Sequence, residues 1–296
     1  MEDEEADCSN CERDTESPPR LENGGGYFYV NKDGFPISTK TWERMWTHVE
    51  KIHPDGMKMV YKIREKADLE EVPYASAPVF SPSCVLTVSE KLVLIQKYLQ
   101  QLQYNHTGTQ LFEIKKYRPY TGLMDTAREI IKESLPIKCL EAVIVSLYLT
   151  SSMSELQRFT IGFKTQFGSS IYRHVVLGVH ANGKYGALGL SRRDDLMYKP
   201  LTFKSLCDLL NDFVESYGNY LHSVKKIKLS LPIVHDLHSC EKIHWKYLAL
   251  SPAKLSASDM KKILEKYSRE LRTTVSPYTV TSPRKEANGN KQQSGK

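Results

Sequence analysis

The chain has 296 residues, 40% of them hydrophobic, and a mean hydropathy of −0.44, which is typical of a globular protein with polar ends. No apolar run reaches the roughly 18 residues that a membrane-spanning helix needs, and no collagen-like or repeated pattern occurs. Its 41 Lys and Arg residues against 35 Asp and Glu residues give a net charge of +6. The composition therefore excludes a membrane-spanning, fibrous or repeat protein.

The charge is distributed unevenly along the chain. Residues 1–22 contain nine acidic residues and two arginines, a net charge of −7, so residues 23–296 carry +13. A basic folded part favours an acidic partner, such as a nucleic acid, an anionic membrane or an acidic peptide. Charge alone does not choose among these partners.

Composition divides the chain into four expected regions. Residues 1–26 are acidic and end in three glycines, and residues 276–296 are rich in Pro, Asn, Gln and Lys. Neither segment can bury enough apolar surface to offset its ordering entropy, so we expect two disordered tails, one acidic and one basic. Between them we expect a helical N-terminal lobe at residues 27–103 and a second domain at residues 104–275.

The N-terminal lobe is predicted to be helical from its hydrophobic spacing. Trp42, Met45, Trp46 and Val49 form one apolar stripe, which stops at the turn beginning with His53. A second helix is expected near residues 57–69, and a third near residues 87–104. The sequence Thr87-Val88-Ser89-Glu90 predicts a capping box at the start of the third helix.

The second domain mixes helices with strands. Helices are expected at residues 122–133 and, after Pro136, from about residue 138, which puts Cys139 in a first helical turn. Strands are expected at residues 158–164 and 171–190, with Asn182-Gly183 as a hairpin turn. The predicted order then continues with a helix at 203–221, strands at 225–233 and 243–251, and a helix at 258–272. This order predicts an α+β fold.

The six cysteines are spaced irregularly, in a chain too long to need a disulfide framework. Because the acidic start is also unlike a signal peptide, we expect a cytosolic protein with reduced thiols. Cys8-Ser-Asn-Cys11 resembles half of a zinc knuckle, but no second pair follows it. We expect no metal and no other cofactor.

The expected strand register and the position of one cysteine suggest a site made of three reactive side chains. If Asn182-Gly183 is a two-residue loop, His174 lies opposite Ser191 on the neighbouring strand. Cys139 at a helix N-terminus, next to Lys138, has the surroundings that favour a thiolate. These residues fit a cysteine hydrolase, with Cys139 as nucleophile, His174 as base and Ser191 orienting the imidazole.

Each of these residues also has a structural interpretation. A lone cysteine is often a small buried apolar residue, and a strand histidine more often has a structural role than a catalytic one. A serine at a strand end is usually a turn former. The register argument favours the catalytic interpretation because it links two of the three residues geometrically.

Several longer motifs resemble the vasohibin family. They are Tyr104-Asn105-His106-Thr107-Gly108-Thr109-Gln110, Pro136-Ile137-Lys138-Cys139-Leu140-Glu141-Ala142-Val143-Ile144 and Tyr185-Gly186-Ala187-Leu188-Gly189-Leu190-Ser191-Arg192-Arg193. The resemblance begins near Asn31, extends to the last helix and covers roughly 250 residues. It implies a transglutaminase-like cysteine peptidase core at residues 104–275, in which a helix carrying the cysteine packs on an antiparallel sheet.

The resemblance also implies a reaction and the residues that perform it. The expected activity is removal of the C-terminal tyrosine of α-tubulin, by a cytoplasmic, microtubule-associated carboxypeptidase without a metal or organic cofactor. Cys139, His174 and Ser191 would be the catalytic residues. The backbone carbonyl of Leu196 is a second candidate for the group that orients His174.

The resemblance assigns substrate contacts to Tyr104, Lys138 and Arg192. A carboxypeptidase needs a fixed cation for the free carboxylate, and Arg192 can form two parallel hydrogen bonds where Lys138 offers a point charge. The tyrosine hydroxyl would help to hold the oxyanion. Without the resemblance, solvated basic residues and core packing of Tyr104 would be the ordinary interpretations.

A wider basic surface is expected to attract the acidic tubulin tail. The candidate residues are Lys115, Lys116, Arg118, Arg193, Lys199, Lys225, Lys226 and Lys228. No nucleic-acid-binding motif accompanies the 17 tyrosines, and we expect neither nucleic-acid binding nor membrane insertion. The resemblance further implies that a small helical vasohibin-binding protein docks on the N-terminal lobe near Trp42, Met45 and Trp46, although packing of these side chains within the chain is the alternative.

Two other functions remain open at the level of sequence. The chain could be a non-catalytic protein that binds microtubules or another acidic surface, with an inert Cys139. It could also be a transglutaminase-like enzyme that transfers the acyl group to an amine instead of water. Secretion is possible in the family, but the sequence shows no signal peptide.

Overall fold

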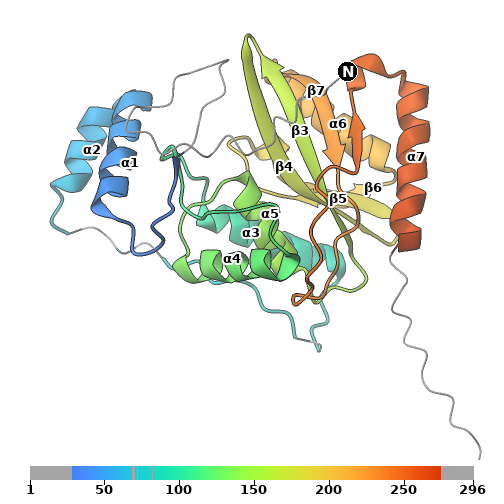
Figure 1. Ribbon diagram of the computed structural model, residues 1–296, viewed down its shortest axis with the longest axis horizontal. Helices are drawn as coiled ribbons and strands as arrows, with labels where there is room; N and C mark the ends of the chain where they lie inside the picture. Colours follow the sequence, from blue (N-terminus) through green and yellow to red (C-terminus); the bar gives the residue numbers. More distant parts are fainter. Residues whose placement is uncertain (1–28, 69–70, 72, 82, 275–296) are drawn as a thin grey trace, which may run out of the picture.

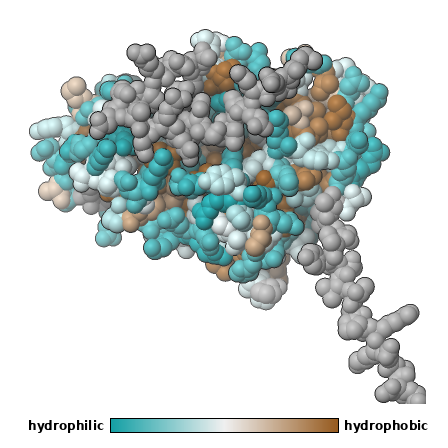
Figure 2. All heavy atoms as spheres, in the orientation of Figure 1, coloured by the Kyte–Doolittle hydropathy of each residue, from teal (hydrophilic) through white to brown (hydrophobic). Residues whose placement is uncertain are grey.

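The computed structural model describes residues 29–68, 71, 73–81 and 83–274. The two predicted tails, together with Cys8 and Cys11, lie outside the described residues. Within the described part of the chain, no helix is both long enough and apolar enough to cross a bilayer. The face drawn in Figure 2 is mostly polar, with separate apolar patches.

An antiparallel sheet flanked by helices forms the centre of the described structure, in agreement with the predicted α+β class (Figure 1). Its strand order is β6-β5-β4-β3-β7-β8, and each neighbouring pair is antiparallel. The strands are β3 (Gln157–Phe167), β4 (Ser170–Ala181), β5 (Lys184–Leu188), β6 (Lys199–Phe203), β7 (Ser223–Leu229) and β8 (Leu248–Leu250).

The two faces of the sheet are covered by different helices. Along β4, Leu177 and Val179 belong to one buried cluster, whereas Val176, next to Leu177, belongs to another, as strand alternation requires. The first cluster includes α3 (Val88–Leu102), α4 (Tyr120–Glu133) and α5 (Cys139–Leu149). The second includes α6 (Leu206–Asn219) and α7 (Ala257–Thr274). The sheet is therefore buried on both faces.

The helix that carries Cys139 is held on several sides. Ala142, Val143, Ile144 and Val145, which follow each other in α5, are all fully buried. α5 packs against both α4 and β4. Such burial all around a helix leaves its first turn as the part that can present a side chain to solvent or substrate.

The N-terminal helices are less completely buried. α1 (Thr39–Ile52) and α2 (Gly56–Arg64) pack on each other at one end of the molecule, and a short parallel pair joins β1 (Tyr29–Val30) to β2 (Thr109–Gln110) (Figure 1). Met45 of the predicted apolar stripe is buried. Large hydrophobic side chains on the two helices are nevertheless exposed: Trp42, Ile52, Met57, Met59, Tyr61 and Ile63.

Most predicted elements occur close to their expected positions. The capping box is present, since Glu90 N–H bonds the Thr87 hydroxyl at 3.3 Å and Thr87 N–H bonds the Glu90 carboxylate at 2.8 Å. The second helix is shorter than predicted and ends at Arg64. β6 and two short 3-10 helices, η2 (Asp194–Leu196) and η3 (Pro252–Lys254), had not been predicted.

The hairpin register is confirmed only along part of the two strands. Ala181 pairs with Lys184 and Leu177 with Leu188, as the two-residue turn requires. The paired part of the two strands does not extend as far as His174 and Ser191. Beyond Leu188, both backbone groups of Gly189 bond to the side chain of Gln96 in α3, at 2.9 and 3.2 Å, and the strand ladder stops.

Candidate active site

Cys139 is the first residue of α5, as predicted, and its side chain is half-buried. Pro136 precedes it, and Lys138 has an extended backbone, so the chain turns into the helix at the cysteine. The unpaired N–H groups and dipole of a helix N-terminus favour a negative charge there. The four described cysteines, Cys84, Cys139, Cys207 and Cys240, form no disulfides.

The buried side chain of Glu141 caps the start of this helix. Its Oε2 accepts a hydrogen bond from the backbone N–H of Lys138 at 2.7 Å, and the side chain is fully buried. Burial raises the pKa of this carboxyl to about 7, against the opposing effect of the Lys138 N–H. Its other oxygen has no hydrogen-bond partner within the described structure. The sequence analysis missed this residue, although Glu at the third position of a helix is a known capping signal.

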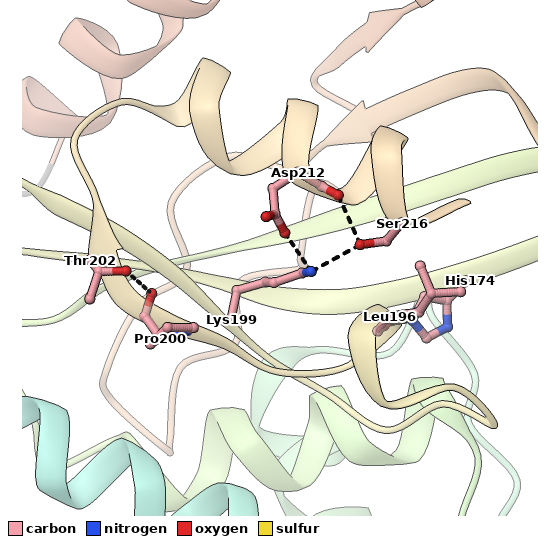
Figure 3. Close-up of polar contacts among 7 residues, drawn as sticks. All are labelled: His174, Leu196, Lys199, Pro200, Thr202, Asp212 and Ser216. Atoms are coloured by element: carbon pink, nitrogen blue, oxygen red, sulfur yellow. Dashed lines mark hydrogen bonds and ion pairs between the residues drawn. The ribbon is translucent and has the colours of Figure 1, made fainter. Parts of the chain in front are cut away.

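His174 lies on β4 opposite Phe163 of β3, and it is half-buried. Its Nε2 lies 2.8 Å from the carbonyl oxygen of Leu196, at the end of η2 (Figure 3). Because a carbonyl only accepts, Nε2 carries the proton, which leaves Nδ1 as the basic nitrogen of the neutral ring. Burial lowers the pKa of His174 to about 4, although the Leu196 carbonyl opposes this shift.

Ser191 follows β5 and is half-buried. Its hydroxyl accepts a hydrogen bond from the backbone N–H of Arg193 at 3.3 Å. Among the described residues, the hydrogen-bond acceptor of the His174 ring is Leu196 and not Ser191. Of the two groups considered for orienting the imidazole, the carbonyl is the one in contact with it.

The three predicted substrate-binding residues lie together. The Lys138 ammonium and the Arg192 guanidinium lie 5.7 and 5.5 Å from the centre of the Tyr104 ring. The chain reaches this position because residues 103–105 run beside Ile137, with Asn105 N–H bonded to its carbonyl at 2.8 Å. Burial raises the pKa of Tyr104, and the charge of Cys139 raises it further. The thiol therefore lies within electrostatic range of this cationic group.

Lys138 is an unusual lysine because only 6% of its surface is exposed. Its ammonium donates a hydrogen bond to the carbonyl oxygen of Asn105 at 2.8 Å. Burial is the main cause that lowers the pKa of Lys138 to about 8; Arg192 also lowers it, whereas Glu141 and Cys139 raise it. Arg192, in contrast, is exposed and extends toward solvent beside it.

Two histidines near these cations were missed by the sequence analysis. His48 comes from α1 and His106 from the loop after α3, where its ring lies 5.1 Å from that of Tyr104. Burial, followed by the charges of Lys138 and Arg192, lowers the pKa of both. A Cβ atom at Gly108 would collide with the His48 ring, so this glycine, at a φ of +70°, is needed for their close approach.

Tyr217 of α6 connects the thiol with the surroundings of His174. Its ring packs 5.3 Å from that of Phe163, the strand partner of His174. Burial and the charge of Cys139 both raise the pKa of Tyr217. The thiol is therefore within electrostatic range of this side chain of α6. The Tyr217 hydroxyl is buried and has no hydrogen-bond partner within the described residues.

One member of the predicted basic surface is misassigned. Lys199 is buried on β6, where its ammonium pairs with Asp212 and donates to the Ser216 hydroxyl at 3.1 Å (Figure 3). It anchors α6 to the edge of the sheet and is not available to a substrate. Lys228 instead lies among like charges, since burial and then Lys246, Lys116, Arg173 and Lys226 lower its pKa.

These residues provide a thiol, a neutral imidazole, a phenol and two cations. No group of three or more His, Cys, Asp or Glu residues within the described ranges is close enough together to hold a metal ion. The arrangement suits acyl chemistry on a substrate that carries a negative charge next to the reacting bond.

Comparison with known proteins agrees with these motifs. The family model described as Vasohibin matches residues 26–272. The chain belongs to the vasohibin family. It is also 50% identical to a mouse (Mus musculus) protein, Tubulinyl-Tyr carboxypeptidase 1, over 268 residues, which are 90% of this chain and 71% of the mouse protein. The vasohibin match includes Cys139, His174 and every other site residue discussed above.

Proposed function

We propose that this vasohibin is a cysteine carboxypeptidase that removes the C-terminal tyrosine of α-tubulin. The observation that carries the proposal is the pair of cations, Lys138 and Arg192, beside a cysteine at a helix N-terminus. It is supported by the 50% identity to a mouse protein named for this activity. Such activity would associate the protein with microtubules in the cytoplasm.

In the proposed mechanism, Cys139 is the nucleophile and His174 is the base. The Nδ1 atom of His174 takes the thiol proton while sulfur attacks the carbonyl carbon before the terminal tyrosine. The C–N bond breaks, and the imidazolium returns the proton to the leaving amino group of tyrosine. Water then hydrolyses the thioester, which restores the thiol and leaves a shortened peptide. The Leu196 carbonyl holds the tautomer that this sequence requires.

The cations explain why the enzyme would cut at a chain end. Arg192 can bind both oxygens of a terminal carboxylate, and the ammonium of Lys138 adds positive charge from a buried position. Tyr104 packs against both and provides an aromatic surface for the substrate. An internal peptide bond lacks the carboxylate and so could not form the two parallel hydrogen bonds with Arg192.

Partner binding is a second part of the proposal. Of the lobe predicted at residues 27–103, α3 is buried in the main core, whereas α1 and α2 expose large apolar side chains. Met57, for example, is 76% exposed. We assign this surface to a small helical vasohibin-binding protein, and residues 104–275 to the catalytic domain with its transglutaminase-like chemistry. Several exposed apolar side chains on two neighbouring helices are typical of a surface that binds a partner helix.

The reaction can be tested with a glutamate-rich peptide that ends in tyrosine. The parent protein, mixed with the helical partner, should release free tyrosine, whereas Cys139→Ala should release none. Cys240→Ala, which removes an exposed cysteine elsewhere, should behave like the parent. Equal product from parent and Cys139→Ala would refute the peptidase assignment and favour a binding protein. Isopeptide products in place of tyrosine would favour acyl transfer to an amine.

A further inference from the structure

The carbonyl that orients His174 belongs to η2, a single 3-10 turn that leads into β6. Leu196 ends this turn. Its N–H bonds the Arg193 carbonyl at 3.1 Å, and its own carbonyl oxygen lies 2.8 Å from Nε2 of His174 (Figure 3). A 3-10 turn of three residues has poor internal hydrogen-bond geometry, so contacts from neighbouring elements decide where its last carbonyl points.

The chain is fixed directly after η2, where β6 begins. Lys199 is buried there, three residues after Leu196, and its ammonium pairs with Asp212 and donates to the Ser216 hydroxyl at 3.1 Å (Figure 3). Both partners come from α6, which also packs against η2. Because a buried ammonium is costly to leave without its partners, this contact fixes the start of β6 against α6. The helix is therefore a rigid support beside the turn.

The C-terminal end of α6 contacts the turn itself. Tyr220 is the C-cap residue of this helix and is half-buried. The Arg193 guanidinium lies 4.8 Å from the centre of its ring, within the range of a cation–π contact. The Tyr220 hydroxyl donates a hydrogen bond to the Asp195 carboxylate, which raises the pKa of the tyrosine. One side chain of α6 thus holds the residue that begins the turn and the residue directly before Leu196.

Ser191 restrains the same turn through its backbone. The serine hydroxyl accepts a hydrogen bond from the N–H of Arg193 at 3.3 Å, while the side chain of this arginine lies over Tyr220. The carbonyl of Arg193 in turn accepts the N–H of Leu196. Ser191 and Tyr220 therefore act on one residue, and that residue is bonded to the one that orients the imidazole.

We propose that Tyr220 is a positioning residue for the catalytic base. It holds η2 so that the Leu196 carbonyl points at Nε2 of His174 and leaves Nδ1 free to take the thiol proton. This inference rests on the role of His174 in the proposed function. Loss of the contact would misalign the imidazole, and the effect should be on kcat because the turn orients the base and does not bind the terminal carboxylate.

Turnover of a Tyr-ended peptide, with the helical partner present, tests this role. Tyr220→Ala should lower kcat at least tenfold and leave KM within twofold of the parent. Tyr220→Phe keeps the ring beside Arg193 and loses only the hydroxyl, so it should recover part of the loss. Thermal melting checks that each variant is folded. A kcat for Tyr220→Ala equal to that of the parent would overturn the proposal.

The matched control is another tyrosine that hydrogen-bonds a carboxylate. The Tyr247 hydroxyl donates to Glu270 at 3.1 Å, directly before β8 at the opposite edge of the sheet from β6. Tyr247→Ala should keep the kcat of the parent. If it loses as much as Tyr220→Ala, the effect is a general loss of packing and the positioning role is wrong.

A double variant tests whether Tyr220 and Ser191 act through the same turn. Because both restrain Arg193, the combination of Ser191→Ala with Tyr220→Ala should lose little more kcat than the worse single variant. Independent effects would instead multiply. A double loss equal to the product of the two single losses would contradict a shared action through η2.

A measurement without substrate separates this proposal from the peptidase assignment. In protein with ¹⁵N-labelled histidine, the Nε2 proton of His174 is assigned by its absence in His174→Gln. Its exchange with water should be at least tenfold faster in Tyr220→Ala than in the parent and unchanged in Tyr247→Ala. Equal exchange in Tyr220→Ala and the parent would overturn the positioning role. Faster exchange in a protein whose parent releases no tyrosine would support that role and refute the peptidase assignment.

Discussion

The Nε2 atom of His174 donates a hydrogen bond to the carbonyl oxygen of Leu196 across 2.8 Å. A backbone carbonyl cannot be ionised or rotated away as a side chain can, so it fixes both the ring orientation and the tautomer. The arrangement differs from the usual triad, in which a carboxylate orients the histidine and stabilises its protonated form. Without that charge, burial keeps the imidazole neutral and lowers its pKa to about 4.

The low pKa of His174 predicts the acid side of the activity profile. A histidine base works only when neutral, so activity should persist as the pH falls through 6.5 and decline only as it approaches 4. The measurement is kcat/KM for tyrosine release between pH 4 and 8, with circular dichroism at each pH to confirm the fold. A decline centred near pH 6.5 would mean that the histidine is not held in this neutral, buried state.

Ser191→Ala should reduce turnover without abolishing it. The imidazole keeps its bond to Leu196 in this variant, so we expect a loss in kcat of roughly tenfold, far less than in Cys139→Ala. Ser223→Ala, which changes an exposed serine on β7, serves as the control. If Ser191→Ala is as inactive as Cys139→Ala, the hydroxyl is an essential member of the triad and the carbonyl alone does not orient the base.

Arg192→Glu should weaken recognition of the terminal carboxylate. We expect KM for a free-acid peptide to rise at least tenfold, because the substitution replaces the paired cation with a repelling charge. Lys266→Glu, which reverses an exposed cation on α7 outside the expected basic surface, is the control. The assignment fails if the parent cuts amidated peptides as well as free acids, or if both variants lose affinity equally.

Glu141 should make stability depend on pH. The pKa of its carboxyl is 4.5 in the unfolded chain and about 7 in the native one, so between these values the native state holds more protons. Stability should therefore fall as the pH rises from 4.5 to 7, by up to about 3 kcal/mol from this group.

Urea unfolding at several pH values measures this effect. Glu141→Gln should lose that part of the pH dependence, whereas Glu129→Gln, on the exposed side of α4, should retain it. An unchanged slope in Glu141→Gln would show that the buried carboxyl does not titrate in this range.

Local sequence signals predicted the elements, but contacts between distant segments determined the site. Apolar spacing and the Thr87 capping signal were enough to place α3, and Asn182-Gly183 was enough for the start of the hairpin. The strand pairing ends at Leu188, where a side chain from α3, Gln96, forms hydrogen bonds with both backbone groups of Gly189. A local sequence pattern does not predict a contact between two residues that are 93 positions apart in the chain.

The same limit explains which site residues were found. Cys139, Lys138 and Arg192 lie in motifs that the family resemblance identifies, whereas His48 reaches the site from a helix assigned to partner binding. Lys199 was placed on the surface because a lysine is usually exposed, but Asp212 and Ser216 of α6 satisfy its charge inside the protein. Such pairing depends on the packing of α6 on the sheet.

The most direct test of the proposed chemistry is to trap the covalent intermediate. The parent protein with its partner is mixed with excess Tyr-ended peptide, quenched with acid within one turnover and digested for mass spectrometry. The account predicts an adduct on Cys139 with the mass of the peptide acyl group lacking its terminal tyrosine, and no adduct on Cys84, Cys207 or Cys240. Tyrosine release with no adduct on Cys139, or with the acyl group on another residue, would contradict it.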